Sequence, residues 1–104
     1  MLAPEVGNMN MSRFFPYEKS IVINALYDII EALGLYLNSA NSARGMLLVS
    51  DMEHTGKMCI ALNFAIPSKQ TQVDIFPGGS NLKFAERWGP AVLNELSERV
   101  KRVH

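Results

Sequence analysis

The sequence lacks several features that mark particular classes of protein. It has a single cysteine, Cys59, so no disulfide can form within the chain and nothing favours an oxidising compartment. No apolar run approaches the roughly 20 residues that a membrane-spanning helix needs. Residues 1–10 lack the basic and apolar regions of a signal peptide. We therefore expect a cytoplasmic protein that has no membrane partner.

Net charge is also absent, because ten basic residues balance ten acidic ones. A neutral chain has no general electrostatic attraction for nucleic acid or for an anionic membrane. The one dense basic cluster, at residues 99–104, suits the last turn of a helix, where cations complement the helix dipole. We therefore expect no nucleic-acid partner.

The length of 104 residues fits one domain, and 48% hydrophobic residues suffice for a core without disulfides or a metal. Residues 1–10 show no periodicity and contain Pro, Gly and two Asn, which predicts a flexible N-terminal arm. We expect a single domain over residues 11–104. Its apolar content is slightly high for so small a body, which is a first indication of a partner surface.

The clearest elements are two helices. Residues 17–33 carry apolar side chains at the three- and four-residue spacing of one helical face, with Pro16 suited to the start and Gly34 to the stop. A second helix follows Asn81, which suits an N-cap, and keeps helical spacing to the end of the chain. Because Pro90 lacks an amide donor, we expect a kink or a break into two segments there.

Four segments between the helices have strand patterns, at residues 35–37, 45–50, 57–66 and 71–76. Residues 12–15 would add a short first strand, which rests on the weakest pattern. Short loops make consecutive strands antiparallel neighbours.

The fold class is therefore α+β, with the element order β-α-β-β-β-β-α. Both helices must bury an apolar stripe, and one face of the sheet can receive them. We predict a two-layer sandwich, in which a curled antiparallel sheet of four to five strands has the N-terminal and the C-terminal helix on one face. The side chains expected on that face are Met58, Ile60, Leu62, Phe64, Val73 and Ile75.

The opposite face of the sheet is unusually apolar, because a face in contact with water normally carries Thr, Lys, Glu or Arg. Two explanations compete. A second subunit packs against this face, or the curled sheet and the N-terminal arm close over it within one chain. We favour self-association, with a dimer as the expected homo-oligomer. The expected interface residues are Cys59, Ala61, Asn63, Ala65, Leu47 and Val49.

Candidate catalytic and metal-binding residues are few. Asp51, Glu53 and His54 share one loop, but neighbouring loop residues rarely converge on one ion and no known ligand spacing is present. Cys59 lies among apolar residues in a strand, where burial raises the pKa of a thiol. We therefore expect no metal, no cofactor and no catalytic residue, and we predict a non-catalytic interaction module rather than an enzyme.

One segment offers an alternative function. Two glycines precede the last helix, where backbone amides and a helix N-terminus can hold an anion, although the pattern matches neither known phosphate-binding loop. Two aromatic residues follow and would line an apolar gap between the helix and the sheet. The alternative is a domain that binds a small apolar or anionic ligand. Its candidate residues are Gly78, Gly79, Ser80, Asn81, Phe84 and Trp88.

Overall fold

The computed structural model describes residues 11–53, 55–79 and 81–103, so the arm expected at residues 1–10 lies outside the described residues, as do His54, Ser80 and His104. The described chain has the predicted element order, and the weakly predicted first strand is present. The elements are β1 (Met11–Phe15), α1 (Lys19–Ala32), β2 (Tyr36–Asn41), β3 (Met46–Ser50), β4 (Lys57–Ala65), β5 (Gln70–Pro77) and α2 (Leu82–Val103).

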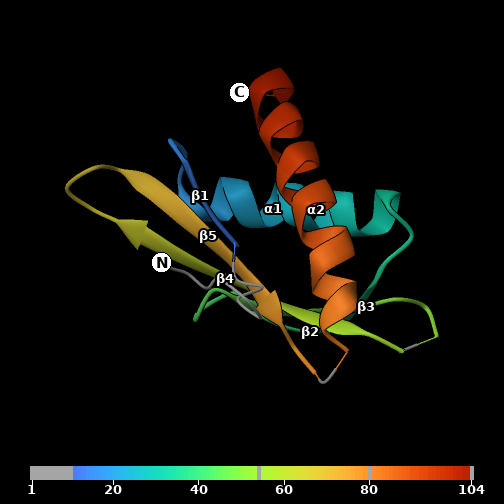
Figure 1. Cartoon of the computed structure of the whole chain (residues 1–104). Helices are drawn as coiled ribbons and strands as arrows, with labels where there is room; N and C mark the ends of the chain where they lie inside the picture. The colour runs from blue at the N-terminus through green and yellow to red at the C-terminus, as the bar shows by residue number, and fades with distance from the viewer. Residues whose placement is uncertain (1–10, 54, 80, 104) are drawn as a thin grey trace, which may run out of the picture.

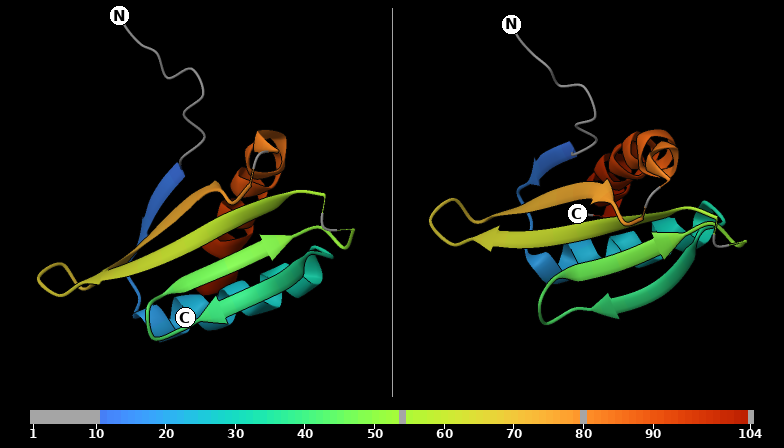
Figure 2. Two further views of the ribbon diagram at one scale, coloured as in Figure 1. Left: turned by 90° about the horizontal axis from the view of Figure 1, so that it is seen from below. Right: turned by 60° about the horizontal axis from the view of Figure 1, so that its bottom comes forward.

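The five strands form one antiparallel sheet in the spatial order β1-β5-β4-β3-β2. Strands β2 to β5 follow one another as hairpins, and β1 joins the sheet beside β5. Both helices lie on the same side of the twisted sheet (Figures 1 and 2), where α1 packs on β2 and β4, and α2 packs on β5, β4 and β1. The predicted two-layer α+β architecture is confirmed.

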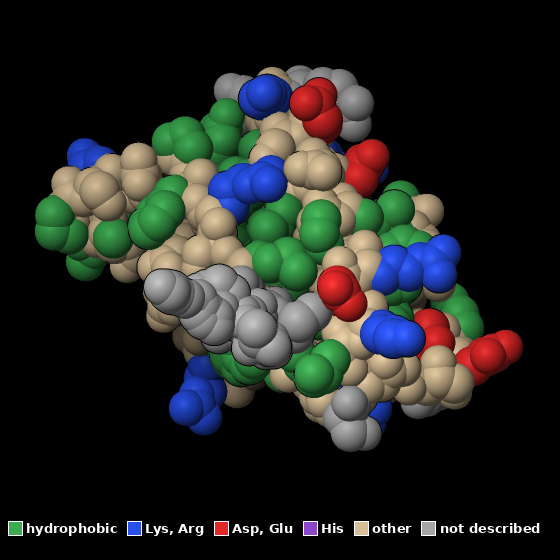
Figure 3. Space-filling view, viewed as in Figure 1, with side chains coloured by type: hydrophobic (Ala, Val, Ile, Leu, Met, Phe, Trp, Pro, Cys, Tyr) green, Lys and Arg blue, Asp and Glu red, His purple; other side chains and the backbone are tan. Residues whose placement is uncertain are grey.

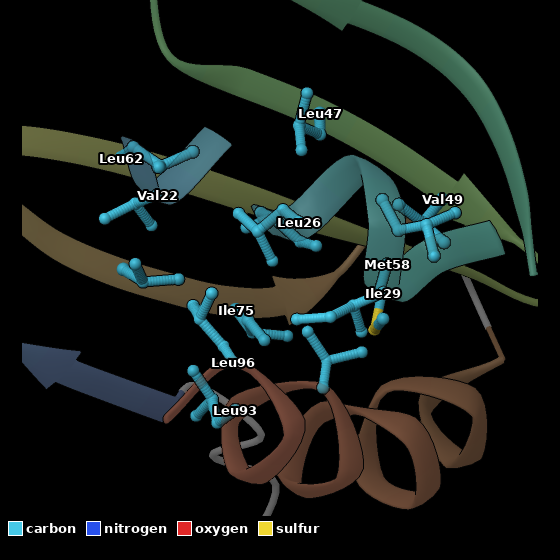
Figure 4. Close-up of a cluster of buried hydrophobic side chains, with 14 of the residues drawn as sticks. Val22, Leu26, Ile29, Leu47, Val49, Met58, Leu62, Ile75, Leu93 and Leu96 are labelled. Atoms are coloured by element: carbon cyan, nitrogen blue, oxygen red, sulfur yellow. The ribbon is translucent and has the colours of Figure 1, made fainter. Parts of the chain in front are cut away.

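The core lies between the helices and one face of the sheet (Figure 4). Leu26 and Ile29 of α1 and Leu96 of α2 are fully buried, and they meet Ile60 and Ile75 of the sheet. Burying one such side chain contributes about 1.5–3 kcal/mol relative to leaving it in water. The helical spacing of α1 and the two-residue alternation of β4 and β5 therefore converge on one contiguous core.

Helix α1 is slightly shorter than the predicted range of residues 17–33. It begins at Lys19, after Glu18 in an extended conformation with φ −66° and ψ 156°. It ends as predicted at Gly34, whose φ of 75° allows a left-handed stop. The Gly34 N–H donates to Glu31 O at 3.0 Å, and the Leu35 N–H donates to Ile30 O at 2.9 Å. This pair of hydrogen bonds is the Schellman arrangement, which satisfies carbonyls at the helix end.

Strand β2 does not end at residue 37, as the predicted range of 35–37 would have it, but continues to Asn41. The chain turns instead after Asn41, whose backbone carbonyl accepts the Gly45 N–H at 2.8 Å. The Asn41 side-chain oxygen also accepts the Arg44 N–H at 3.1 Å. A side chain that bonds its own backbone in this way stabilises a turn, and Gly45 has the positive φ of 74° that this turn requires.

Helix α2 continues through Pro90 as one element of 22 residues rather than breaking there. Pro90 is exposed, so the carbonyl that loses its helical donor can meet water. The preceding Gly89 is buried, and a Cβ added to it would lie 2.7 Å from the Met11 sulfur. Glycine at this position therefore lets α2 approach β1 closely.

The end of the β4–β5 hairpin projects beyond both helices (Figure 2). Phe64, which was expected under the helices, is consequently 36% exposed, and the following Ile66 is 75% exposed. Hydrophobic side chains are visible on this projecting end in Figure 3. The alternation of β4 places Phe64 on the correct face, but no helix reaches that far along the strand.

A substitution at Gly56 tests how tightly the β3–β4 connection packs against α2. A Cβ added to Gly56 would lie 2.5 Å from the Phe84 Cβ, so we expect Gly56→Ala to lower the free energy of unfolding by about 1–3 kcal/mol through overpacking. Gly79→Ala is the matched control, because nothing lies within 4 Å of the added Cβ. Urea unfolding of both variants measures the difference. Equal stability of the two variants would show that the packing at Gly56 is looser than described.

Candidate interaction surface

The open face of the sheet is the side that neither helix covers (Figure 2). In β4, Met58 and Ile60 point into the core, which places Cys59 and Ala61 on the open side. The strand register sets one side chain of β3 and one of β5 beside each of these two residues. The apolar members of this group, which we call the open-face patch, are Met46, Leu48, Cys59, Ala61 and Phe76.

The open-face patch is partly shielded by its own members, and Lys57 and Asp74 lie beside it on the same face. Met46 is 37% exposed, and the other four residues are half-buried. Leu48 pairs with Cys59 and leans toward Gly78, since a Cβ added to Gly78 would lie 3.0 Å from a Leu48 methyl group. The middle of the patch is small-sided, because Cys59 and Ala61 have short side chains. A second layer of protein can therefore approach the backbone of β4 closely at this point.

A hollow adjoins the open-face patch at its β2 side. It has a volume of about 420 Å³ and is lined by Ser39, Ala40 and Asn41 of β2, by residues of β3, and by Cys59. The residues from β2 are small or polar and carry no charge. The apolar patch thus passes directly into a shallow polar margin on one side.

The other margin of the patch is also polar. The Asp74 carboxylate accepts hydrogen bonds from the Ser12 hydroxyl and, at 2.9 Å, from the Gln72 side-chain amide. Asp74 lies beside Ala61. Because its carboxylate already accepts two hydrogen bonds within the chain, it does not need a further polar partner. Asn63 and Ala65, which were expected at the interface, lie on this same face but are exposed farther along β4.

Leu47 and Val49 were also expected on the open face, and the structure places them on the opposite one. They pair with Ile60 and Met58 and are buried in the core under α1 and α2. The sequence of β3 does not show which of its side chains face the core, because Met46 and Leu48 are as hydrophobic as their neighbours. The register with β4, which the sequence does not state, assigns Met46 and Leu48 to the open side.

Cys59 is the reactive group nearest the centre of the open-face patch. Burial raises the pKa of its thiol above the ordinary value of 9.0, so the thiol is protonated at neutral pH. Desolvation by burial is the cause of this rise in the pKa. Cys59 therefore behaves as a small apolar side chain rather than as a nucleophile.

The segment before α2 uses its polar groups within the protein. The Gly78 N–H donates to Lys57 O at 3.0 Å, which extends the pairing of β5 with β4. The Asn81 side-chain oxygen accepts the Lys83 N–H at 3.2 Å, as expected for an N-cap, and its amide donates to Thr55 O at 3.3 Å. Gly79 is exposed, and Ser80 lies outside the described residues.

The two aromatic candidates of α2 lie against the core. Phe84 is buried, and Trp88 is half-buried with its ring centroid 6.4 Å from that of Phe84. The Arg87 guanidinium lies 5.5 Å from the centroid of the Trp88 ring, at a distance suited to a cation–π contact. A hollow of about 200 Å³ lies elsewhere, where Phe14 and Tyr17 face the last turns of α2.

The acidic loop after β3 is organised by hydrogen bonds to Asp51. Its carboxylate accepts the Thr55 N–H at 2.8 Å and the Thr55 hydroxyl, and the latter bond is the main reason that the pKa of Asp51 is lowered. Among the residues that the structure describes, no three His, Cys, Asp or Glu side chains are grouped to hold a metal ion. Asp51 therefore acts as the residue that closes this turn.

Comparison with known proteins gives no further assignment. The chain matches no protein-family model and no curated protein. Within the described residues, no helix is both long and apolar enough to cross a membrane.

The pKa of Cys59 can be measured from the rate of thiol alkylation as a function of pH. At submicromolar protein we expect the rate to rise through a pKa above 9.0, because burial disfavours the thiolate. The same shift implies that stability falls as pH rises past 9.0, since the unfolded thiol ionises first. Leu48→Ala uncovers the thiol and should lower its pKa. An unchanged pKa in that variant would contradict burial as the cause.

Proposed function

We propose that this protein is a non-catalytic module that self-associates through the open-face patch. The observation that carries the proposal is an apolar strip of Met46, Leu48, Cys59, Ala61 and Phe76 on the side of the sheet that neither helix covers. An antiparallel sheet with one face in water normally carries polar residues there. Covering this strip would remove apolar surface from water, at about 25 cal/mol per Å².

The shape of the strip favours another sheet as the covering layer. Two packed sheets lie about 10 Å apart, a spacing that short side chains in the centre allow. Cys59 and Ala61 occupy the centre, and the larger Leu48 and Phe76 flank them on the neighbouring strands. A two-fold axis through the centre would set the small side chains of the two copies against each other, so that the two sheets can approach closely.

The polar margins support the same arrangement. Asp74 is held by Ser12 and Gln72 on one side, and Ser39 and Asn41 lie along the other. An apolar centre with a polar rim is the usual composition of a protein–protein interface. Because the patch itself is uncharged, two copies bring no like charges together at the centre.

The alternative, a small apolar or anionic ligand held near α2, draws less support. The amide of Gly78 and the side chain of Asn81 already have partners within the chain, and Phe84 is buried. An anion at this segment would have to compete with those hydrogen bonds. Self-association remains the better proposal.

The reactivity of Cys59 reports directly on this contact. We expect its alkylation at tens of micromolar protein to be several-fold slower than at submicromolar protein, because the partner covers the thiol. Leu48→Lys should abolish this dependence on concentration, since a charge beside Cys59 would be buried without a partner. Ser68→Lys, with the same added charge on the exposed β4–β5 turn, should retain it.

Two outcomes would contradict the proposal. One is an alkylation rate of Cys59 that does not change with protein concentration. The other is sedimentation equilibrium that gives the mass of a single chain at tens of micromolar.

A further inference from the structure

The sheet has two edge strands, and they differ in how they are protected. Edge strands present unpaired backbone groups, and proteins shield them with charges, prolines or covering elements. In β1, Arg13 reaches over to α2 and donates to Leu93 O at 3.2 Å and to Ser97 Oγ at 3.0 Å, and Pro16 follows the strand directly. Strand β2, at the opposite edge, reads Tyr-Leu-Asn-Ser-Ala-Asn and contains neither charge nor proline.

Strand β2 has a bulge between Leu37 and Ser39, which is a feature that can protect an edge. It bends the first part of the strand, and the pairing with β3 is regular again from Ser39 to Asn41. This regular stretch is exposed. It offers a short edge of small uncharged residues for pairing with another strand.

Helix α1 runs beside β2 in the opposite direction (Figure 2), because the short connection at residues 33–35 turns the chain back. Ser20, Asn24, Tyr27 and Glu31 recur at three- and four-residue spacing and therefore share one flank of α1. The first three of them, with Lys19, line a hollow of about 510 Å³ that the β2–β3 turn closes at Ser42. The first part of this flank therefore faces the β2–β3 turn, beside the end of β2.

The charged side chains at the two ends of α1 interact unfavourably with the helix dipole. Lys19 lies in the first turn of α1 and Glu31 in the last, and the helix has no acidic residue in its first turn and no basic residue in its last. The helix dipole favours the opposite placement. Within the described residues, neither the Lys19 ammonium nor the Glu31 carboxylate has an ion-pair partner. The two lie about 18 Å apart along the helix, at 1.5 Å per residue, so they cannot pair with each other.

We propose that β2 pairs antiparallel with β2 of a second copy of this chain, so that two five-stranded sheets become one continuous sheet. The two-fold axis of such a pair reverses the direction of α1 in the second copy. Lys19 of each copy then lies at the same end of the shared edge as Glu31 of the partner subunit, so opposite charges come together at both ends. Arg44, exposed in the β2–β3 turn, adds positive charge at the Lys19 end.

The charge order selects a second copy as the occupant. A positive and a negative end on one edge are self-complementary under a two-fold axis, whereas an unrelated strand would need its own matching charges. This contact is separate from the open-face patch. Its axis is perpendicular to the sheet, whereas the axis of a face-to-face contact runs parallel to the sheet. A protein that makes both contacts forms an assembly larger than a dimer.

The test uses a charge exchange in the Leu48→Lys background, so that only the β2 contact is measured. We expect the Leu48→Lys parent to dimerise, and Lys19→Glu or Glu31→Lys added to it to weaken self-association about tenfold, since each sets like charges against each other twice. An equimolar mixture of the two variants should regain the parental affinity. In the mixed dimer opposite charges come together at both ends again. Native mass spectrometry distinguishes the mixed dimer from either homodimer.

The controls separate this contact from effects on folding and on the open face. Both substitutions improve the fit of α1 to its dipole, so each should raise the unfolding midpoint of the monomer, measured at high dilution, while it weakens association. Lys83→Glu and Glu86→Lys make the same charge changes on the exposed surface of α2 and should leave association unchanged. If the open-face proposal is wrong, the Leu48→Lys change is harmless and the comparison still holds.

Amide hydrogen exchange completes the test. The amides of Ser39–Asn41 should exchange more slowly as the concentration of the parent rises. The proposal is overturned if the parent is monomeric, if the mixture associates no better than either variant alone, or if the β2 amides gain no protection. Capture of an unrelated extended peptide by β2, without pairing between copies, would also overturn it.

Discussion

The central position of β4 is the constraint on which the rest of the structure depends. Nine residues long, β4 pairs with β5 along its whole length and with β3 along its first half. Its alternation sends Met58, Ile60 and Leu62 into the core, where both helices meet them. The same alternation forces Cys59 and Ala61 onto the other side. The core and the open-face patch are therefore two consequences of one strand.

The two surfaces that folding leaves unused differ in chemistry. The open-face patch is apolar and small-sided, with polar groups at its margins that are already hydrogen bonded. The β2 edge is polar, and charges lie near its two ends, on α1 and in the following turn. The open-face patch is suited to an interface stabilised by the burial of apolar surface. The β2 edge is suited to strand pairing, through backbone hydrogen bonds and opposite charges. The proposed assembly assigns one kind of interaction to each.

The prediction from sequence was most accurate where the pattern is local. The apolar spacing of α1 and the stop at Gly34 located the helix to within two residues, because both depend on neighbouring residues alone. The end of β2 was misplaced, since Asn38 and Asn41 both suit a turn and it is Asn41 that bonds to the backbone of Arg44. The sequence left open whether α2 continues through Pro90, and the neighbouring Gly89 packs against a distant strand.

The candidate surface was predictable as a face but only partly as a set of residues. Cys59 and Ala61 alternate with larger side chains, so the sequence alone assigns them to the open face. Strand β3 is apolar on both sides, and its register with β4 was needed to assign Met46 and Leu48 to that face. The sequence by itself determined the helices, the strands and the sidedness of β4, because these follow from the repeat of 3.6 or two residues. Tertiary structure decided which strand pairs β1, namely β5 with Met11 opposite Ile75, and hence that β2 remains an edge. That choice rests on contacts between residues 64 positions apart, which no local repeat encodes.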